Sequence, residues 1–301
     1  MAGEDGNGFM IVGANYRRHE VMAKRDGVWR RLRKMPLFSI ALLVVIILGC
    51  LMARFLANHD PGKFYLSNLS QPPNSEFFFG TDSLGRDIYS IIWYGGRVSI
   101  FIGLLATCVI TIIGVTYGCI SGMAPEFLDN MMMRAVELAQ SIPVLLTVLL
   151  IVSIMDTQNV VTLSLLIGSV SWFSLARIVR GEVRQIRRSE YVLASRCMGA
   201  SFMRVALKHL IPNFVSAIMF VVISSVSTSM SMESTLSFLG FGLPAEVPSW
   251  GNMLSLADRA LLMNTWWVIV VPGLFLVMTL LSITAIGYYF RSETNKRPSN
   301  L

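Results

Sequence analysis

Long apolar runs alternate with polar segments along the chain. Six runs of about 19 to 26 residues contain almost no charged side chains, and they cover residues 37–57, 98–120, 131–155, 160–179, 214–232 and 265–290. At 1.5 Å per residue, each helix would be long enough to cross a hydrocarbon layer roughly 30 Å thick. The pattern predicts an all-α polytopic membrane protein with six transmembrane helices and both termini on one side.

Composition and charge agree with this class and add an orientation. The 301 residues are 54% hydrophobic and 14% charged, whereas about a quarter of the residues in a soluble domain are charged. A net charge of +7 can indicate nucleic-acid binding, but in this chain the basic residues flank apolar runs. Of the 25 Lys and Arg residues, 20 fall on the side of the termini and 5 on the other, which predicts cytoplasmic termini.

The runs and their flanks divide the chain into three predicted regions. Residues 1–36 form a basic cytoplasmic segment, residues 37–290 a six-helix domain, and residues 291–301 a cytoplasmic tail. Within the domain, external segments are predicted over residues 58–96 and 233–264, and a cytoplasmic loop over residues 180–212.

Ionisable groups are rare inside the runs. Glu137 lies three residues after Arg134, a spacing at which helical side chains can pair, and Glu233 closes the fifth run. Carriers driven by protons or sodium usually need carboxylates at the middle of the membrane. Because none is clearly central in this sequence, the driving energy is expected to come from elsewhere.

Hydroxyl side chains are concentrated in the second half of the fifth run. They include Ser224, Ser225, Ser227 and Thr228. Small polar residues allow helices to pack closely, and they can also line a hydrated path. The sequence favours packing and leaves both readings open.

The polar segment 189–213 reads as two short helices that meet at Gly199. Ser189 is suited to an N-cap, and the apolar residues of the second helix recur on one face. Such a segment could dock into a groove on a soluble partner or lie on anionic lipid. The residues by themselves do not decide between the two.

An external turn, FGTDSLGRD, precedes the second apolar run. Its glycines permit positive φ, and its aspartates can bond to nearby backbone groups. An ordered turn is the simpler interpretation of Thr81, Asp82, Arg86 and Asp87. The alternative, which we also consider for Trp250, is a gate or a docking surface for another protein. The pair Trp266 and Trp267 most simply marks the membrane boundary.

Several kinds of site have no motif in this sequence. It contains no G-x-x-x-x-G-K-[ST] loop, no nucleophile elbow and no HExxH. The four cysteines form no CxxC and no cluster with histidine. We therefore predict a subunit that is not an enzyme and binds no cofactor or metal of its own.

Several stretches, in order, resemble one family of proteins. The segment LASRCMGASFMRVALKHLIP, residues 193–212, resembles the cytoplasmic loop of ABC importer permeases, with Leu, Ser and His at three positions where the family has other residues. FGTDSLGRDIYSIIWYGGRVSI, WFSLARIVRGEV, ESTLSFLGFGLPAEVPSWGNML and WWVIVVPG are similar to the C-type permeases of dipeptide, oligopeptide and nickel importers. The resemblance covers roughly residues 30 to 290, whereas the tail GYYFRSETNKRPSNL lacks the acidic residues of its relatives.

The resemblance implies a type I ABC importer permease fold in a prokaryotic cell membrane. Segment 189–213 would then couple the spans to cytoplasmic ATPases through residues Glu190, Tyr191, Ala194, Ser195, Arg196, Gly199, Ala200 and Ser201. The implied partners are a second six-helix permease, two ABC ATPases that bind ATP and Mg²⁺, an external substrate-binding protein and membrane lipid, with no nucleic acid.

The expected cargo is a di- or oligopeptide. Within the family the alternative is nickel or a metal chelate. Outside the family it is a membrane scaffold that transports nothing, for which segment 189–213 would be expendable.

Overall fold

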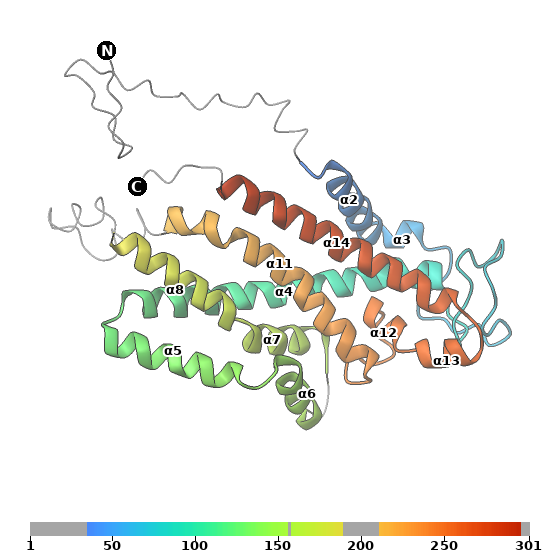
Figure 1. Ribbon diagram of the computed structural model, residues 1–301. Coiled ribbons are helices and arrows are strands. Elements are labelled where there is room, and N and C mark those ends of the chain that lie inside the picture. Colours follow the sequence, from blue (N-terminus) through green and yellow to red (C-terminus); the bar gives the residue numbers. More distant parts are fainter. Residues whose placement is uncertain (1–34, 156–157, 189–210, 296–301) are drawn as a thin grey trace, which may run out of the picture. The chain divides into compact units, whose positions relative to one another are not determined.

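The structure, a computed structural model, describes residues 35–155, 158–188 and 211–295 (Figure 1). The chain divides into Met1–Met35 and Pro36–Leu301, and the described helices all belong to the second unit. Its described residues form helices joined by loops, and their strand-like pairing is confined to a bridge between Thr81 and Asp87. The prediction of an all-α chain is confirmed for these residues.

The helices keep the order of the apolar runs. They are α2 (Leu37–Leu51), α3 (Ala53–Leu56), α4 (Ile88–Met123), α5 (Glu126–Gln140), α6 (Val144–Ile154), α7 (Val160–Ser171), α8 (Phe173–Arg187), α11 (Ile211–Phe238), α12 (Trp250–Leu254), α13 (Ala257–Leu262) and α14 (Trp267–Asn295).

Two helices are long and apolar enough to cross a membrane unaided, namely α4 and residues 267–292 of α14. The third run is broken into α5 and α6, which meet at 73°, and the fourth into α7 and α8, which meet at 47°. Pro143 explains the first break, because proline has no N–H and disfavours helical backbone before it. With each bent pair counted as one span, four spans are found among the described residues. The predicted six remain a prediction.

Helix α4 begins well before the apolar run that predicts it. Asp87 is its N-cap, and Asp87 Oδ2 accepts a hydrogen bond from the backbone N–H of Ser90 (3.0 Å). A carboxylate at this position satisfies a free N–H of the first turn and favours an earlier helix start. The predicted external segment 58–96 is therefore helical from Ile88 onward. Helix α11 likewise continues past residue 232 to Phe238.

Helix α4 packs against α7, α8 and α11. Its contact with α8 depends on glycines at every fourth position, Gly114, Gly118 and Gly122. A Cβ atom on Gly118 would lie 2.5 Å from the carbonyl oxygen of Ala176 and 2.7 Å from Val179 Cβ. Such a stripe of small residues lets two helix backbones approach closely, so α8 is held tightly along the C-terminal half of α4.

At the other end of α4, Trp250 is the centre of a buried cluster with residues of α2, α4 and α14. Its side chain is 0% exposed, and its Nε1–H donates to the carbonyl oxygen of Ile92 (2.8 Å). Gly96 leaves room for the indole, because a Cβ there would lie 2.7 Å from the ring. Trp250 thereby anchors the short helix α12 against α4.

Candidate functional site

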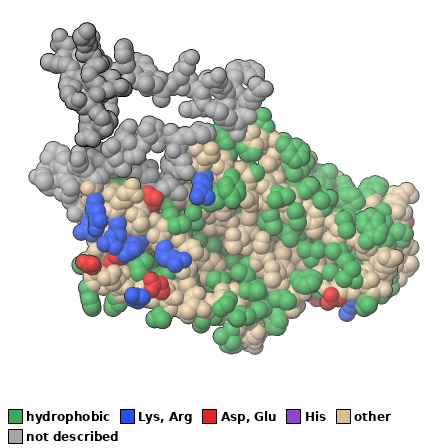
Figure 2. Space-filling view, viewed as in Figure 1, with side chains coloured by type: hydrophobic (Ala, Val, Ile, Leu, Met, Phe, Trp, Pro, Cys, Tyr) green, Lys and Arg blue, Asp and Glu red, His purple; other side chains and the backbone are tan. Residues whose placement is uncertain are grey.

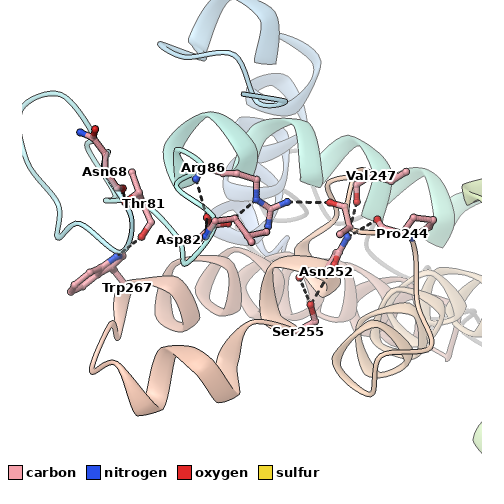
Figure 3. A network of polar contacts seen from close by, with 11 residues as sticks. Asn68, Thr81, Asp82, Arg86, Pro244, Val247, Asn252, Ser255 and Trp267 are labelled. Carbon is pink, nitrogen blue, oxygen red and sulfur yellow. Dashed lines mark hydrogen bonds and ion pairs between the residues drawn. The ribbon is translucent and has the colours of Figure 1, made fainter. Parts of the chain in front are cut away.

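The turn before α4 has the ordered geometry predicted for it (Figure 3). Gly80 and Gly85 adopt positive φ of 75° and 76°. Asp82 Oδ1 accepts from the backbone N–H groups of Leu84 (2.8 Å) and Arg86 (2.9 Å), and Asp82 Oδ2 accepts from Arg86 Nε at 2.7 Å. The interpretation as a structured turn is confirmed.

Two contacts tie this turn to segments far along the chain. Arg86 Nη1 donates to the carbonyl oxygen of Ala245 (3.1 Å), and Trp267 Nε1 donates to that of Thr81 (3.1 Å) (Figure 3). The segment around Ala245 is also held in place. Asn252 Nδ2 donates to the carbonyl oxygens of Pro244 (2.9 Å) and Val247 (3.0 Å). We call residues 80–87 together with residues 244–252 the outer cap, because both lie in segments predicted to be external.

The outer cap buries the residues for which a gate or docking role is predicted. The side chains of Thr81, Asp82, Arg86, Asp87 and Trp250 are all buried. In this conformation they bond within the chain and are not open to a docking protein, so the gate or docking role remains a prediction.

The two neighbouring tryptophans, Trp266 and Trp267, differ in exposure. Trp266 is exposed, whereas Trp267 is buried and bonds to Thr81. The predicted place of the pair at the membrane boundary remains a prediction, and the structure adds that the indole N–H of Trp267 has a partner inside the fold.

A buried carboxylate lies beneath the outer cap. Glu233 of α11 is 0% exposed. Its Oε1 accepts from the hydroxyls of Ser249 (2.7 Å) and Ser237 (2.9 Å), and its Oε2 is approached by those of Ser234 (3.4 Å) and Ser99 (3.5 Å). No ion pair with a Lys, Arg or His side chain forms at Glu233 within the described part of the chain. Four neutral hydroxyls replace the water that the carboxylate loses on burial.

These hydroxyls belong to three different elements, so Glu233 joins them. Ser99 lies on α4 and also accepts the backbone N–H of Trp250 (3.0 Å). Ser249 is the N-cap of α12 and accepts from the backbone N–H of Asn252 (2.9 Å). We call Glu233 with Ser99, Ser237 and Ser249 the serine latch, since it fastens α11 to α4 and to the outer cap.

The hydroxyl-rich half of α11 presents its groups in different directions. Ser227 Oγ is directed to the carbonyl oxygen of Leu280 on α14 (3.5 Å), which is a packing contact, and Ser225 is partly buried. Thr228 and Thr235 are exposed, and Ser231 between them is half-buried. Ser224 is partly buried. The path-lining role remains a prediction, and the exposed face favours Thr228 over Ser227 for it.

A second buried carboxylate fastens the opposite end of α4 to α8. Asp129 of α5 is 1% exposed. Arg180 Nε and Nη2 donate to its two oxygens at 2.6 and 2.5 Å, Arg184 Nη1 donates at 2.9 Å, and the hydroxyl of Ser121 donates at 2.6 Å. We call this group the arginine clamp.

The arginine clamp lies outside the apolar runs, because Asp129 precedes residues 131–155 and Arg180 follows residues 160–179. Arg180 and Arg184 bring two positive charges to this one carboxylate, and opposite charges this close favour its ionised form. The carboxylate is therefore charged at neutral pH and keeps both guanidiniums in place. The predicted contact between Arg134 and Glu137 is also formed, at 2.8 Å, on the surface of α5.

The predicted coupling residues 190–201 lie outside the described residues, so their role remains a prediction. The described part of α8 nevertheless reaches Arg187, immediately before them. Both the arginine clamp and the glycine stripe of α4 act on α8. Neither contact follows from the sequence alone, because 51 residues separate Asp129 from Arg180.

Among the described residues, His, Cys, Asp and Glu form no group of three suited to a metal ion, and the absence of a metal remains a prediction. Glu233 is surrounded by serines, which are weaker ligands than carboxylates or imidazoles.

Comparisons with known proteins cover nearly the whole chain. Residues 114–295 match the family described as binding-protein-dependent transport system inner membrane component. Residues 26–73 match the N-terminal transmembrane domain of oligopeptide transport permease C. The dipeptide transport system permease protein DppC of Bacillus subtilis is 36% identical over 86% of this chain and 81% of its own length. The oligopeptide transport system permease protein OppC of the same organism is 34% identical over 93% of this chain and 94% of its own length.

Proposed function

Because the chain belongs to the binding-protein-dependent transport system inner membrane components, we propose that it is a permease subunit of an ATP-driven importer of di- or oligopeptides. The observation that carries this proposal is the likeness to dipeptide and oligopeptide permeases along nearly the entire chain. The scaffold alternative offers no reason for that likeness.

In the proposed arrangement, the end of the domain that contains the arginine clamp faces the cytoplasm and the outer cap faces outward. The excess of Lys and Arg near the clamp supports this orientation. The chain would form the transport path together with a second six-helix permease. The exposed positions of Thr228 and Thr235 on α11 support such a path. Each hydroxyl also donates to the carbonyl oxygen four residues earlier, at 3.1 and 2.8 Å.

Energy would reach the path through segment 189–213 and helix α8. Two ATPase subunits would bind ATP and Mg²⁺, and their closure would push the segment, which continues directly from α8. The close α4–α8 contact and the arginine clamp support this role, because a stiff connection is needed to transmit a displacement. An external binding protein would deliver the peptide to the outer cap.

The cargo is tested by reconstituting the chain with its partner subunits in liposomes. We expect ATP hydrolysis and uptake to rise when the binding protein is loaded with short peptides, and not when it is offered a nickel chelate. Stimulation by the chelate alone would move the cargo to metal. An intact complex that neither cargo stimulates would contradict the importer.

The coupling step is tested by Gly199→Arg, which we expect to remain in the membrane and to separate ATP hydrolysis from uptake. Gly181→Arg is a matched control, because Gly181 is an exposed α8 residue with nothing within 4 Å of an added Cβ. Normal uptake by Gly199→Arg would refute the proposed role of the segment.

A further inference from the structure

A basic pocket opens where α4 ends, α5 begins and α8 ends. Its volume is about 290 Å³, close to the lower end of small-ligand pockets. Arg184, Arg187 and Arg188 line one side, and Glu126 lies on the other. Figure 2 shows that Lys and Arg side chains gather at this end of the molecule.

The three arginines differ in how much of their charge is already matched. Arg184 donates to Asp129 in the arginine clamp. Arg187 Nη1 donates to the backbone carbonyl oxygens of residues 123 (3.0 Å) and 124 (3.4 Å), which are neutral. Arg188 forms no ion pair within the described ranges. Glu126 offsets one charge at most, so the pocket keeps a surplus of positive charge.

Apolar side chains project from the helix that begins at this pocket. Phe127, the neighbour of Glu126, is 82% exposed, and Met131, one turn further along α5, is 55% exposed. A surface with exposed apolar side chains beside guanidinium groups is typical of the boundary between lipid headgroups and acyl chains.

We propose that the pocket of Arg184, Arg187 and Arg188 binds the phosphate headgroup of an anionic phospholipid in the cytoplasmic leaflet, whose acyl chains lie against Phe127 and Met131. Guanidinium groups donate paired hydrogen bonds to phosphate oxygens. Basic pockets between helices on the cytoplasmic side suit such headgroups. This site rests on the orientation given in the proposed function and does not depend on the transported cargo.

The structure also suggests how the lipid would act. Arg187 and Arg188 follow directly on the turn of α8 that the arginine clamp holds. A bound phosphate would add a second restraint to the same end of α8, immediately before the proposed coupling segment.

The test uses the full-length chain purified with its partner permease and ATPases. Native mass spectrometry would count bound phosphatidylglycerol, with phosphatidylcholine and inorganic phosphate as comparison probes. The variant Arg188→Gln removes the arginine without an ion pair. Arg177→Gln is the matched control, because Arg177 is an exposed residue of α8 that does not line the pocket.

We expect Arg188→Gln to weaken phosphatidylglycerol binding about fivefold, the effect of one basic residue at an anionic membrane surface. Arg188→Lys should keep most of the binding, and Arg177→Gln should leave it within twofold. Phosphatidylcholine should bind wild type and variants alike.

Three outcomes would overturn the proposal. An equal loss in Arg177→Gln would mean that the attraction is general and not located in the pocket. Full displacement of the lipid by inorganic phosphate at millimolar concentration would mean a site for free phosphate. Unchanged lipid binding with loss of the ATPase subunits in Arg188→Gln would mean that the arginines contact the ATPase.

Discussion

The serine latch makes a prediction that separates hydrogen bonding from charge. Replacing Glu233 by Ala removes the acceptor of two short hydrogen bonds, from Ser249 and Ser237. It also leaves a void in a region where the residue is fully buried. Replacing Glu233 by Gln nearly keeps the shape, removes any negative charge and turns one acceptor oxygen into an amide N–H donor.

The expected magnitudes follow from the contacts. A hydrogen bond contributes about 0.5 to 1.5 kcal/mol net, so loss of the two short bonds costs roughly 1 to 3 kcal/mol. The void left by the buried side chain adds about 1 kcal/mol, which gives about 3 kcal/mol for Glu233→Ala. In Glu233→Gln a serine hydroxyl can rotate to accept from the new amide N–H. Its cost should therefore stay below about 1.5 kcal/mol.

The assay is thermal unfolding of the purified complex, followed by size-exclusion chromatography of heated samples. At roughly 2 °C per kcal/mol, Glu233→Ala should lower the midpoint by about 6 °C and Glu233→Gln by at most about 3 °C. Gly251→Ala should also lower the midpoint, because a Cβ there would lie 2.7 Å from the backbone Cα of Ser234 and 2.8 Å from Glu233 Oε1. If Glu233→Gln were as harmful as Glu233→Ala, the charge would be the essential feature and the latch reasoning would be refuted.

Three further predictions concern the rest of the domain. Asp129→Asn should weaken the attachment of α8 to α4 and α5 by about 2 kcal/mol. It should also lower the amount of peptide taken up per ATP hydrolysed in liposomes. An unchanged ratio would contradict the proposed role of the arginine clamp. Gly118→Val should overpack the α4–α8 contact at a cost of about 1 to 3 kcal/mol, seen as a lower unfolding midpoint, whereas Gly181→Val should not. In a complex without native cysteines, Thr228→Cys should react with a water-soluble thiol reagent and Ser229→Cys, whose position is buried, should not; equal reactivity would contradict a hydrated face on α11.

Local features of this chain can be predicted from its sequence. The apolar runs indicate where α4, α7 and α14 lie, since composition alone decides whether a segment can enter lipid. The external turn can also be predicted from the sequence, because Gly80 and Gly85 adopt positive φ angles and Asp82 accepts a hydrogen bond from the nearby backbone. All of these features depend on residues within a few positions of one another.

Breaks inside the runs are harder to predict. Pro143 is a signal for the bend between α5 and α6, but it lies within a run that hydropathy reads as continuous. Trp172 gives no such signal for the bend between α7 and α8, where its ring contacts Tyr117 with centroids 4.7 Å apart. Tertiary packing decides that bend.

The polar centres could not be predicted, because their members are distant in sequence. Ser99 and Glu233 are 134 residues apart, and Asp129 and Arg184 are 55 residues apart. In the sequence alone, the serines near Glu233 indicate only close helix packing. Only the fold shows that three of them, on three elements, point at the same carboxylate.

The two buried carboxylates differ in the kind of group that surrounds them, and the difference fits opposite mechanical demands. Asp129 is held by guanidiniums, and separating them would leave a buried charge unmatched, which typically costs about 3 to 5 kcal/mol. Glu233 is held by neutral hydroxyls, which water can replace as soon as the outer cap lifts and admits solvent. The arginine clamp should therefore stay closed while the proposed importer changes conformation, and the serine latch should open. Both carboxylates contact α4. A displacement of α8 would therefore move α4 as a rigid element. The outer cap would separate from α4 first, because the serine latch is the weaker of the two contacts.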